Sequence, residues 1–143
     1  MSNLTLFLKK NKKTRENKFY APTKSLLDEN GEPLKWEFRH VPTKEIDKIT
    51  EGCTIEVPVT GKPGMYRPKV NNTKFIEQLI IKSTVVPDLY NAELQDSYGV
   101  MTPEALLKEM VDDPVEYNSL AEFVKNFGGD SETFSDKVEA AKN

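Results

Sequence analysis

The stretch that decides the fold is residues 27–40, Leu27-Asp28-Glu29-Asn30-Gly31-Glu32-Pro33-Leu34-Lys35-Trp36-Glu37-Phe38-Arg39-His40. Its Asn30-Gly31 pair is the strongest short-range signal for a β-hairpin, because both residues tolerate positive φ. Charged side chains then alternate with Leu34, Trp36, Phe38 and His40. This period of two is typical of a strand with one buried face, on which these four residues would lie. We therefore predict a hairpin with arms at 18–27 and 34–41, with Trp36 and Phe38 in the core.

The next segment, up to residue 60, predicts one helix and one strand. Thr43 follows a proline and is the expected cap of a helix that carries Ile46 and Ile49 and ends by Gly52. Residues 53–60 alternate again, with apolar residues on one face and Pro58 indicating an edge strand. Residues 18–60 are thus predicted to form a small α+β unit.

Residues 1–17 are predicted to form a short helix followed by a basic arm. Leu4, Phe7 and Leu8 form one apolar stripe. Because a helix this short is marginal in water by itself, it should dock on another surface. Residues 9–18 hold six basic side chains against the single acidic Glu16. Such a cluster can contact phosphates, but it lacks interleaved aromatic residues, and we interpret it as a solvated arm.

The second half of the chain has a different character. Residues 1–70 carry 14 basic and 9 acidic side chains, whereas residues 71–143 carry 6 and 14. Residues 61–72, rich in glycine and proline, are predicted to be a linker. Residues 73–129 are predicted to form a unit of four short helices, beginning at Thr73, at Asp88, at Thr102-Pro103 and at Asp113-Pro114. Residues 130–143, with Phe134 and Val138 as apolar anchors, are predicted to be a flexible tail. The fold class is therefore α+β, within one compact domain overall.

Composition leaves little material for catalysis. The 143 residues include one cysteine and one histidine, so an intrachain disulfide and a cysteine-rich zinc site are excluded and a histidine-based metal site is not expected. Cys53 and His40 both occupy inward positions of strand patterns, which favours a structural role over a catalytic dyad. No apolar run reaches the roughly 18 residues of a membrane span. We expect a cytoplasmic protein that is not an enzyme, with no cofactor, no metal and no membrane contact.

Residues 92–107 imitate a DNA-binding helix-turn-helix, with a glycine between two predicted helices. Residues 99–126 hold two lysines against six acidic residues, a net charge of −4. A duplex requires phosphate neutralisation, so this layout favours plain helix packing and no nucleic-acid partner.

Four stretches carry a resemblance to a known family. They are Leu6-Phe7-Leu8 with the basic residues that follow it, residues 27–39, residues 105–120 and, most specifically, Val86-Pro87-Asp88-Leu89-Tyr90-Asn91-Ala92-Glu93-Leu94-Gln95-Asp96-Ser97-Tyr98-Gly99-Val100. Together they resemble the XkdN-like tail assembly chaperones of Gram-positive bacteriophages and prophages. The resemblance implies an assembly factor that binds the tape measure protein, keeps it from aggregating, helps recruit tail tube protein and is absent from the finished particle. The alternatives are a structural tail or head-tail component retained in the virion, or a helix-turn-helix regulator.

The sequence also suggests a place for the client. The helices expected at Asp88 and Thr102 carry more apolar and aromatic positions than one narrow stripe uses, and acidic residues surround them. We predict that an amphipathic helix of the client lies in a groove between them. The expected partner-binding residues are Leu89, Tyr90, Leu94 and Tyr98. The alternative for Leu89, Leu94 and Tyr98 is that they face the domain's own core.

Overall fold

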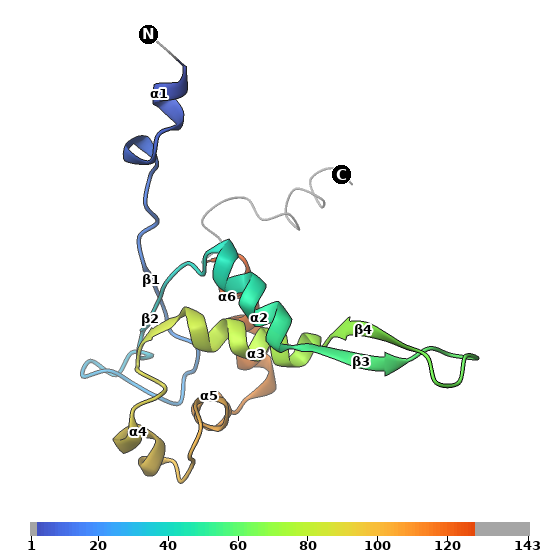
Figure 1. The fold of residues 1–143 in the computed structure, drawn as a ribbon. Coiled ribbons are helices and arrows are strands. Elements are labelled where there is room, and N and C mark those ends of the chain that lie inside the picture. The colour runs from blue at the N-terminus through green and yellow to red at the C-terminus, as the bar shows by residue number, and fades with distance from the viewer. Residues whose placement is uncertain (1–2, 128–143) are drawn as a thin grey trace, which may run out of the picture.

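The computed structural model describes residues 3–127, and in it strands near the N-terminus precede a cluster of helices (Figure 1). The elements are α1 (Leu4–Phe7), the 3-10 helix η1 (Lys9–Asn11), β1 (Lys18–Tyr20), β2 (Trp36–Phe38), α2 (Thr43–Gly52), β3 (Thr54–Pro58), β4 (Tyr66–Val70), α3 (Asn72–Ser83), β5 (Thr84–Val86), α4 (Ala92–Ser97), α5 (Pro103–Met110) and α6 (Pro114–Lys125). The α+β class is confirmed. The predicted tail at 130–143 and the expected helix stop at Gly128-Gly129 lie outside the described residues.

The predicted hairpin is present, with shorter strands and a different turn. Strands β1 and β2 pair antiparallel, and Gly31 has a φ of +81°. Asn30 is not among the residues with positive φ, so the expected two-residue turn is not formed. Instead the Gly31 N–H donates to the Asp28 carbonyl (3.1 Å) and the Asp28 N–H donates to the Glu32 carbonyl (2.7 Å). This closes a three-residue loop. Leu34, expected on the buried face, is 40% exposed because it precedes the strand.

The sheet has a third strand that the sequence did not predict. Its order is β1-β2-β5, with β5 antiparallel to β2. The helix expected to run from Thr73 to Pro87 ends at Ser83, and the next three residues form β5. They are Thr84, Val85 and Val86, all β-branched, which suits a strand better than a helix.

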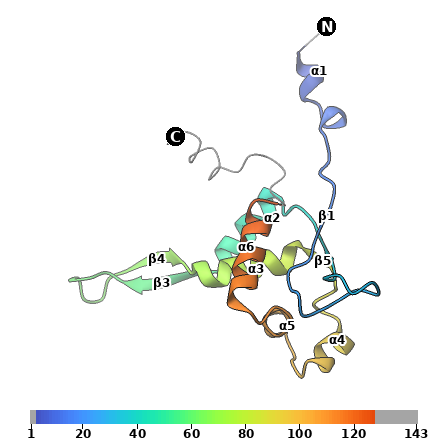
Figure 2. The ribbon, with the colours of Figure 1, turned by 180° about the vertical axis from the view of Figure 1, so that it is seen from behind.

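The core lies between the inner face of this sheet and the helices. Trp36 is 1% exposed and Phe38 is 0% exposed, as predicted. The Phe123 ring of α6 stacks on Tyr20, with 4.3 Å between ring centroids, and meets Phe38 edge to face at 5.3 Å. Helix α3 crosses the middle of the molecule and packs against α2, α5 and α6 (Figures 1 and 2). The hairpin and the helical cluster therefore share one core.

Helix caps explain where the helices begin. Thr102 Oγ1 accepts from the Ala105 N–H (3.1 Å) and the Asp113 carboxylate accepts from the Glu116 N–H (3.0 Å), so both predicted caps are confirmed. Two other predicted caps were wrong. Pro42, not Thr43, stands at the cap position of α2. Asn91, not Asp88, caps α4, which consequently begins at Ala92.

Residues 61–72, expected to be a linker, contain a strand. Strand β4 pairs antiparallel with β3 from Thr54↔Val70 to Pro58↔Tyr66. This β3–β4 ribbon projects away from the helices (Figure 1). Its base is held by the Asn71 N–H, which donates to the carbonyl of buried Cys53 (2.8 Å). The one buried face expected for residues 53–60 is absent beyond Cys53, since Ile55 is 47% exposed.

Helix α1 does not dock as expected. None of its residues is buried, and Leu4 and Phe7 are 67% and 82% exposed. It packs against η1, where the Asn11 side chain donates to the Thr5 carbonyl (2.6 Å). The arm that follows, up to Asn17, is exposed, as the solvated-arm interpretation requires.

Candidate partner-binding surfaces

The four residues predicted to bind a partner do not form one open groove. Leu89 is 2% exposed, and Leu94 and Tyr98 are half-buried and pack against the core. The Gln95 amide donates to the Leu89 carbonyl (2.8 Å) and so fixes α4 beside that residue. Tyr90 alone of the four is exposed, at 57%, and the Lys82 ammonium lies 5.8 Å from the centroid of its ring. The structure therefore leaves Tyr90 accessible and gives the other three a place in the core.

A second surface is the outer face of the three-stranded sheet. Phe19 and Val86 both pair with Glu37, which alternates with the buried Trp36 and Phe38. Directly paired residues share a face, so all three point away from the core. Phe19 is 62% exposed and Val86 is 52% exposed, and Glu37 between them accepts a hydrogen bond from the Asn17 amide (2.8 Å). We call Phe19, Glu37 and Val86 the outer sheet face. The signal for it was present in Phe19, which stands between two inward-facing positions of β1.

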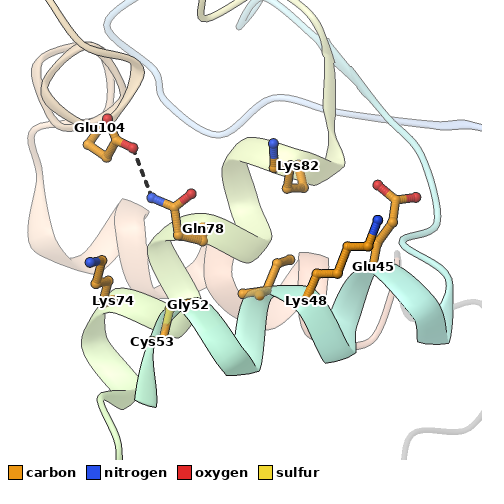
Figure 3. Close-up of a pocket in the computed structure, with 9 residues that line it drawn as sticks. Glu45, Lys48, Gly52, Cys53, Lys74, Gln78, Lys82 and Glu104 are labelled. Atoms are coloured by element: carbon orange, nitrogen blue, oxygen red, sulfur yellow. Dashed lines mark hydrogen bonds between the residues drawn. The ribbon is translucent and has the colours of Figure 1, made fainter. Parts of the chain in front are cut away.

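A third surface is the groove between α2 and α3 (Figure 3), a cavity of about 620 Å³ with Ile49 and Cys53 among its lining residues. The Arg39 guanidinium donates to both carboxylate oxygens of Glu45 (2.6 and 2.9 Å), and this pairing lowers the pKa of Glu45. At the other end the Gln78 amide points toward Glu104 and donates to it at 2.9 Å.

The rest of the α2–α3 groove is polar as well. Its lysines come from both helices, and they are Lys48, Lys74 and Lys82. Both signs of charge thus line the groove, which does not suit a purely apolar partner.

A fourth surface surrounds His40 and Phe127. Three adjoining cavities lie here, of about 720, 550 and 300 Å³. His40 lines the largest and the smallest, Phe127 lines the two smaller ones, and the arm between Lys13 and Asn17 lines the two larger ones. The smallest has an apolar floor, built from Val41, Ile46, Leu79, Val124 and Phe127. We call the three together the basic cleft. The His40 ring meets the Phe127 ring edge to face, with 5.6 Å between centroids.

The rim of the basic cleft is strongly positive. The residues that line its three cavities include eight lysines and arginines and one acidic residue, Glu16. Burial, followed by the charges of Arg15 and Arg39, lowers the pKa of His40. The imidazole is therefore neutral at pH 7 and contributes an aromatic edge to the cleft. The basic arm is evident in the sequence, but its place beside Phe127, more than a hundred residues away, is not.

Cys53 and His40 lie apart in the structure. His40 precedes α2 and Cys53 follows it, so the ten residues of that helix separate the thiol from the imidazole. Within residues 3–127 there is no group of three or more histidine, cysteine or acidic side chains that could hold a metal ion. In the same part of the chain, no helix has the length and apolar character needed to cross a bilayer.

The helix-turn-helix layout of α4 and α5 serves packing. Leu106 and Leu107 of α5 are fully buried. Two of the three charged residues of α5 are engaged within the molecule, since Glu104 accepts from Gln78 and the Lys108 ammonium lies 2.6 Å from the Glu77 carboxylate. Few side chains remain on this helix for contacts with bases.

Comparison with known proteins agrees with this architecture. The chain is 23% identical over 148 residues to an uncharacterized protein, YqbN, of Bacillus subtilis (strain 168), covering 94% of this chain and 98% of YqbN. It is 23% identical over 121 residues to XkdN of the phage-like element PBSX of the same strain, covering 85% and 80%. The crystal structure of YqbN has the same fold, with a TM-score of 0.71, 18% identity and coverage of 92% of this chain and 99% of that one. The model of the phage XkdN-like tail assembly chaperone proteins matches residues 4–142, and the chain therefore belongs to this family.

Proposed function

We propose that this tail assembly chaperone acts without enzymatic activity or cofactor in the host cytoplasm, where it binds the tape measure protein. By covering apolar surface of that client it keeps the client from aggregating and helps bring tail tube protein to it. It is not retained in the mature virion. Membership of the family supports a role in tail assembly, and a non-catalytic role fits the separation of Cys53 from His40.

The observation that carries the proposal is the outer sheet face. Phe19 and Val86 are large apolar residues in register across three strands, and more than half of each side chain is exposed. Tyr90, four residues beyond Val86, is exposed as well. Contiguous exposed apolar residues at a sheet mark protein interaction sites, and an amphipathic helix can lay its apolar face on them.

The predicted site residues divide between two roles in this proposal. Tyr90 contacts the client, whereas Leu89, Leu94 and Tyr98 pack α4 against the core and hold Tyr90 in position. Glu37 lies between Phe19 and Val86, and the Asp88 carboxylate accepts from the Tyr90 N–H (3.0 Å). Their negative charge affects association rate and partner choice more than affinity.

Co-expression with the tape measure protein of the same phage tests the proposal. We expect the wild-type chain to raise the soluble fraction of the client, and Phe19→Ser and Tyr90→Ser to lose this effect while their melting temperatures stay near the wild-type value. Val115→Ser is the matched control, since Val115 is 72% exposed on α6 and belongs to none of the three strands of the sheet. Equal solubilisation by all three variants would contradict the outer sheet face as the client site.

Mass spectrometry of purified particles tests the other half of the proposal. If the chaperone leaves the tail before the particle is complete, it should be missing from particles that contain the tape measure and tail tube proteins. Detection of the chain at a fixed ratio to the tube protein would show instead that it is a structural component.

A further inference from the structure

The basic cleft combines an apolar floor with a positive rim, and this combination defines the chemistry of what it can hold. The floor cavity of about 300 Å³ is lined by Val41, Ile46, Leu79 and Val124, which suits an aromatic or branched side chain. Lys125 of α6 lines this cavity, Lys44 of α2 lines the adjoining cavity of about 720 Å³, and the basic arm adds further positive charge. An occupant that fits both features is an acidic segment with one apolar stripe.

Residues 128–143 have this composition. Their apolar residues larger than glycine include Phe134, Val138 and Ala141, at i, i+4 and i+7, which is the spacing of one helical face. Four acidic residues, Asp130, Glu132, Asp136 and Glu139, stand against two lysines. Charge and apolar spacing thus complement the rim and the floor of the basic cleft.

The chain also leaves the described residues at the cleft itself. Phe127, which lines the floor, is 8% exposed and has a φ of +42°, the left-handed conformation that reverses the chain after a helix. Gly128 and Gly129 follow, and glycine imposes little restriction on the direction of the chain. Seven residue steps separate Phe127 from Phe134, a reach of up to roughly 23 Å when extended. The segment can therefore return to the cavity without crossing the molecule.

We propose that residues 128–143 of the same chain occupy the basic cleft, with Phe134 in the apolar cavity and the acidic side chains against the lysines and arginines of the rim. This interaction lies on a different surface from the outer sheet face and does not depend on the identity of the client. It ties the acidic C-terminal segment to the basic N-terminal arm through a cleft formed by α2, α3 and α6.

Hydrogen exchange on the full chain, read by mass spectrometry, tests the docking. In the wild-type protein we expect slowed exchange over residues 130–141. In Phe134→Asp we expect this protection to be lost and exchange over residues 124–127 to become faster. Burial of one phenylalanine ring corresponds to roughly a tenfold or larger shift in population, so exchange should change by at least that factor. The melting temperature checks that the core remains folded in the variant.

Thr133→Asp is the matched control, because it adds the same charge next to Phe134 but lies off the apolar stripe. This variant should retain the slowed exchange over residues 130–141. Raising the ionic strength from about 0.1 M to about 1 M should weaken the protection, because it shortens the Debye length from ~10 Å to ~3 Å. Absence of protection in the wild type would overturn the proposal, as would equal loss in both variants. Protection that appears only as protein concentration rises would assign the cleft to a second copy and overturn the intramolecular docking.

Discussion

The Thr23 hydroxyl donates a 2.8 Å hydrogen bond to the Glu116 carboxylate, joining two residues that lie ninety-three positions apart in the chain. Thr23 is 1% exposed, and the second oxygen of Glu116 accepts from the Lys24 N–H, also at 2.8 Å. Glu116 stands three residues after the cap Asp113, the position from which a glutamate can turn back to the backbone N–H of the cap residue. Its side chain instead holds the segment between β1 and β2 against the first turn of α6.

Loss of this carboxylate should destabilise the whole domain. Glu116→Ala removes two charge-assisted hydrogen bonds and deprives buried Thr23 of a partner, so we expect the free energy of unfolding to fall by about 2 kcal/mol. Urea denaturation measures the change. Glu122→Ala is the control on the same helix, since Glu122 is exposed and pairs with Lys125 at 3.0 Å. Equal effects of the two variants would show that the contact with Thr23 contributes nothing.

Trp36 should tolerate phenylalanine far better than alanine. Its ring is 1% exposed, and truncation to alanine should cost about 3 to 5 kcal/mol. The indole nitrogen has no hydrogen-bond partner within the described part of the chain, so Trp36→Phe loses no such bond and should cost less than about 1.5 kcal/mol. Thermal unfolding of both variants distinguishes them, and an unchanged melting temperature for Trp36→Ala would contradict the buried position.

Removal of residues 1–11 should leave folding intact. α1 has no buried residue and packs against η1, which the deletion also removes. We expect the free energy of unfolding to change by less than about 0.5 kcal/mol, the size typical of surface changes. Calorimetry is the measurement, and loss of the cooperative transition would be inconsistent with an undocked helix.

Stability should depend on Glu45 in acid. A hydrogen bond from Arg39, followed by the charge of Arg39, lowers the pKa of Glu45 from its ordinary value of 4.5. Because the folded pKa lies below the unfolded one, the pair stabilises the fold above the ordinary pKa, and this stabilisation is lost as pH falls through the folded pKa. Both side chains are about one-third exposed, so the effect should stay below about 1 kcal/mol.

Glu45→Gln isolates this effect of acid. Urea unfolding of the wild type and the variant at several pH values below 6 should give curves that converge as pH falls. A difference that stays constant with pH would assign the role of Glu45 to packing.

Leu89→Ala and Tyr90→Ser should separate packing from client binding. Leu89 is 2% exposed in the core, so its truncation should cost about 2 to 5 kcal/mol and reduce solubilisation of the client only in step with stability. Tyr90 is exposed, and its variant should lose solubilisation at a nearly unchanged melting temperature. If Tyr90→Ser behaves like Leu89→Ala, Tyr90 has a structural role.

Features that depend on neighbouring residues were predictable from the sequence. The hairpin, the end of α2 at Gly52, the start of α5 and the caps Thr102 and Asp113 follow from turn residues and periodicity within a dozen positions. Strand β5 was missed because it extends a helical pattern, and it forms a strand by pairing with β2, more than forty residues earlier. Strand β4 was missed because glycine and proline surround it and its partner lies across a loop.

The candidate site residues also divide into those that nearby sequence indicates and those that only distant contacts bring together. Apolar spacing marked Leu89, Tyr90, Leu94 and Tyr98 equally, since a sequence cannot show which of them the core already covers. Predicting the outer sheet face would require the register of three strands. Predicting the basic cleft would require knowing that His40 and Phe127 lie side by side, a contact that only the folded chain creates.

The projecting β3–β4 ribbon has a consequence for how copies of the protein meet one another. A ribbon of two strands has an open backbone edge on each side, and such edges recruit strands from other molecules. Each strand here contains a proline, Pro58 in β3 and Pro68 in β4. Proline has no N–H, so it fits where the missing group would have pointed outward, and it leaves a gap in the row of donors that an incoming strand needs. This tail assembly chaperone thereby carries, on the β3–β4 ribbon, a barrier to polymerising with itself.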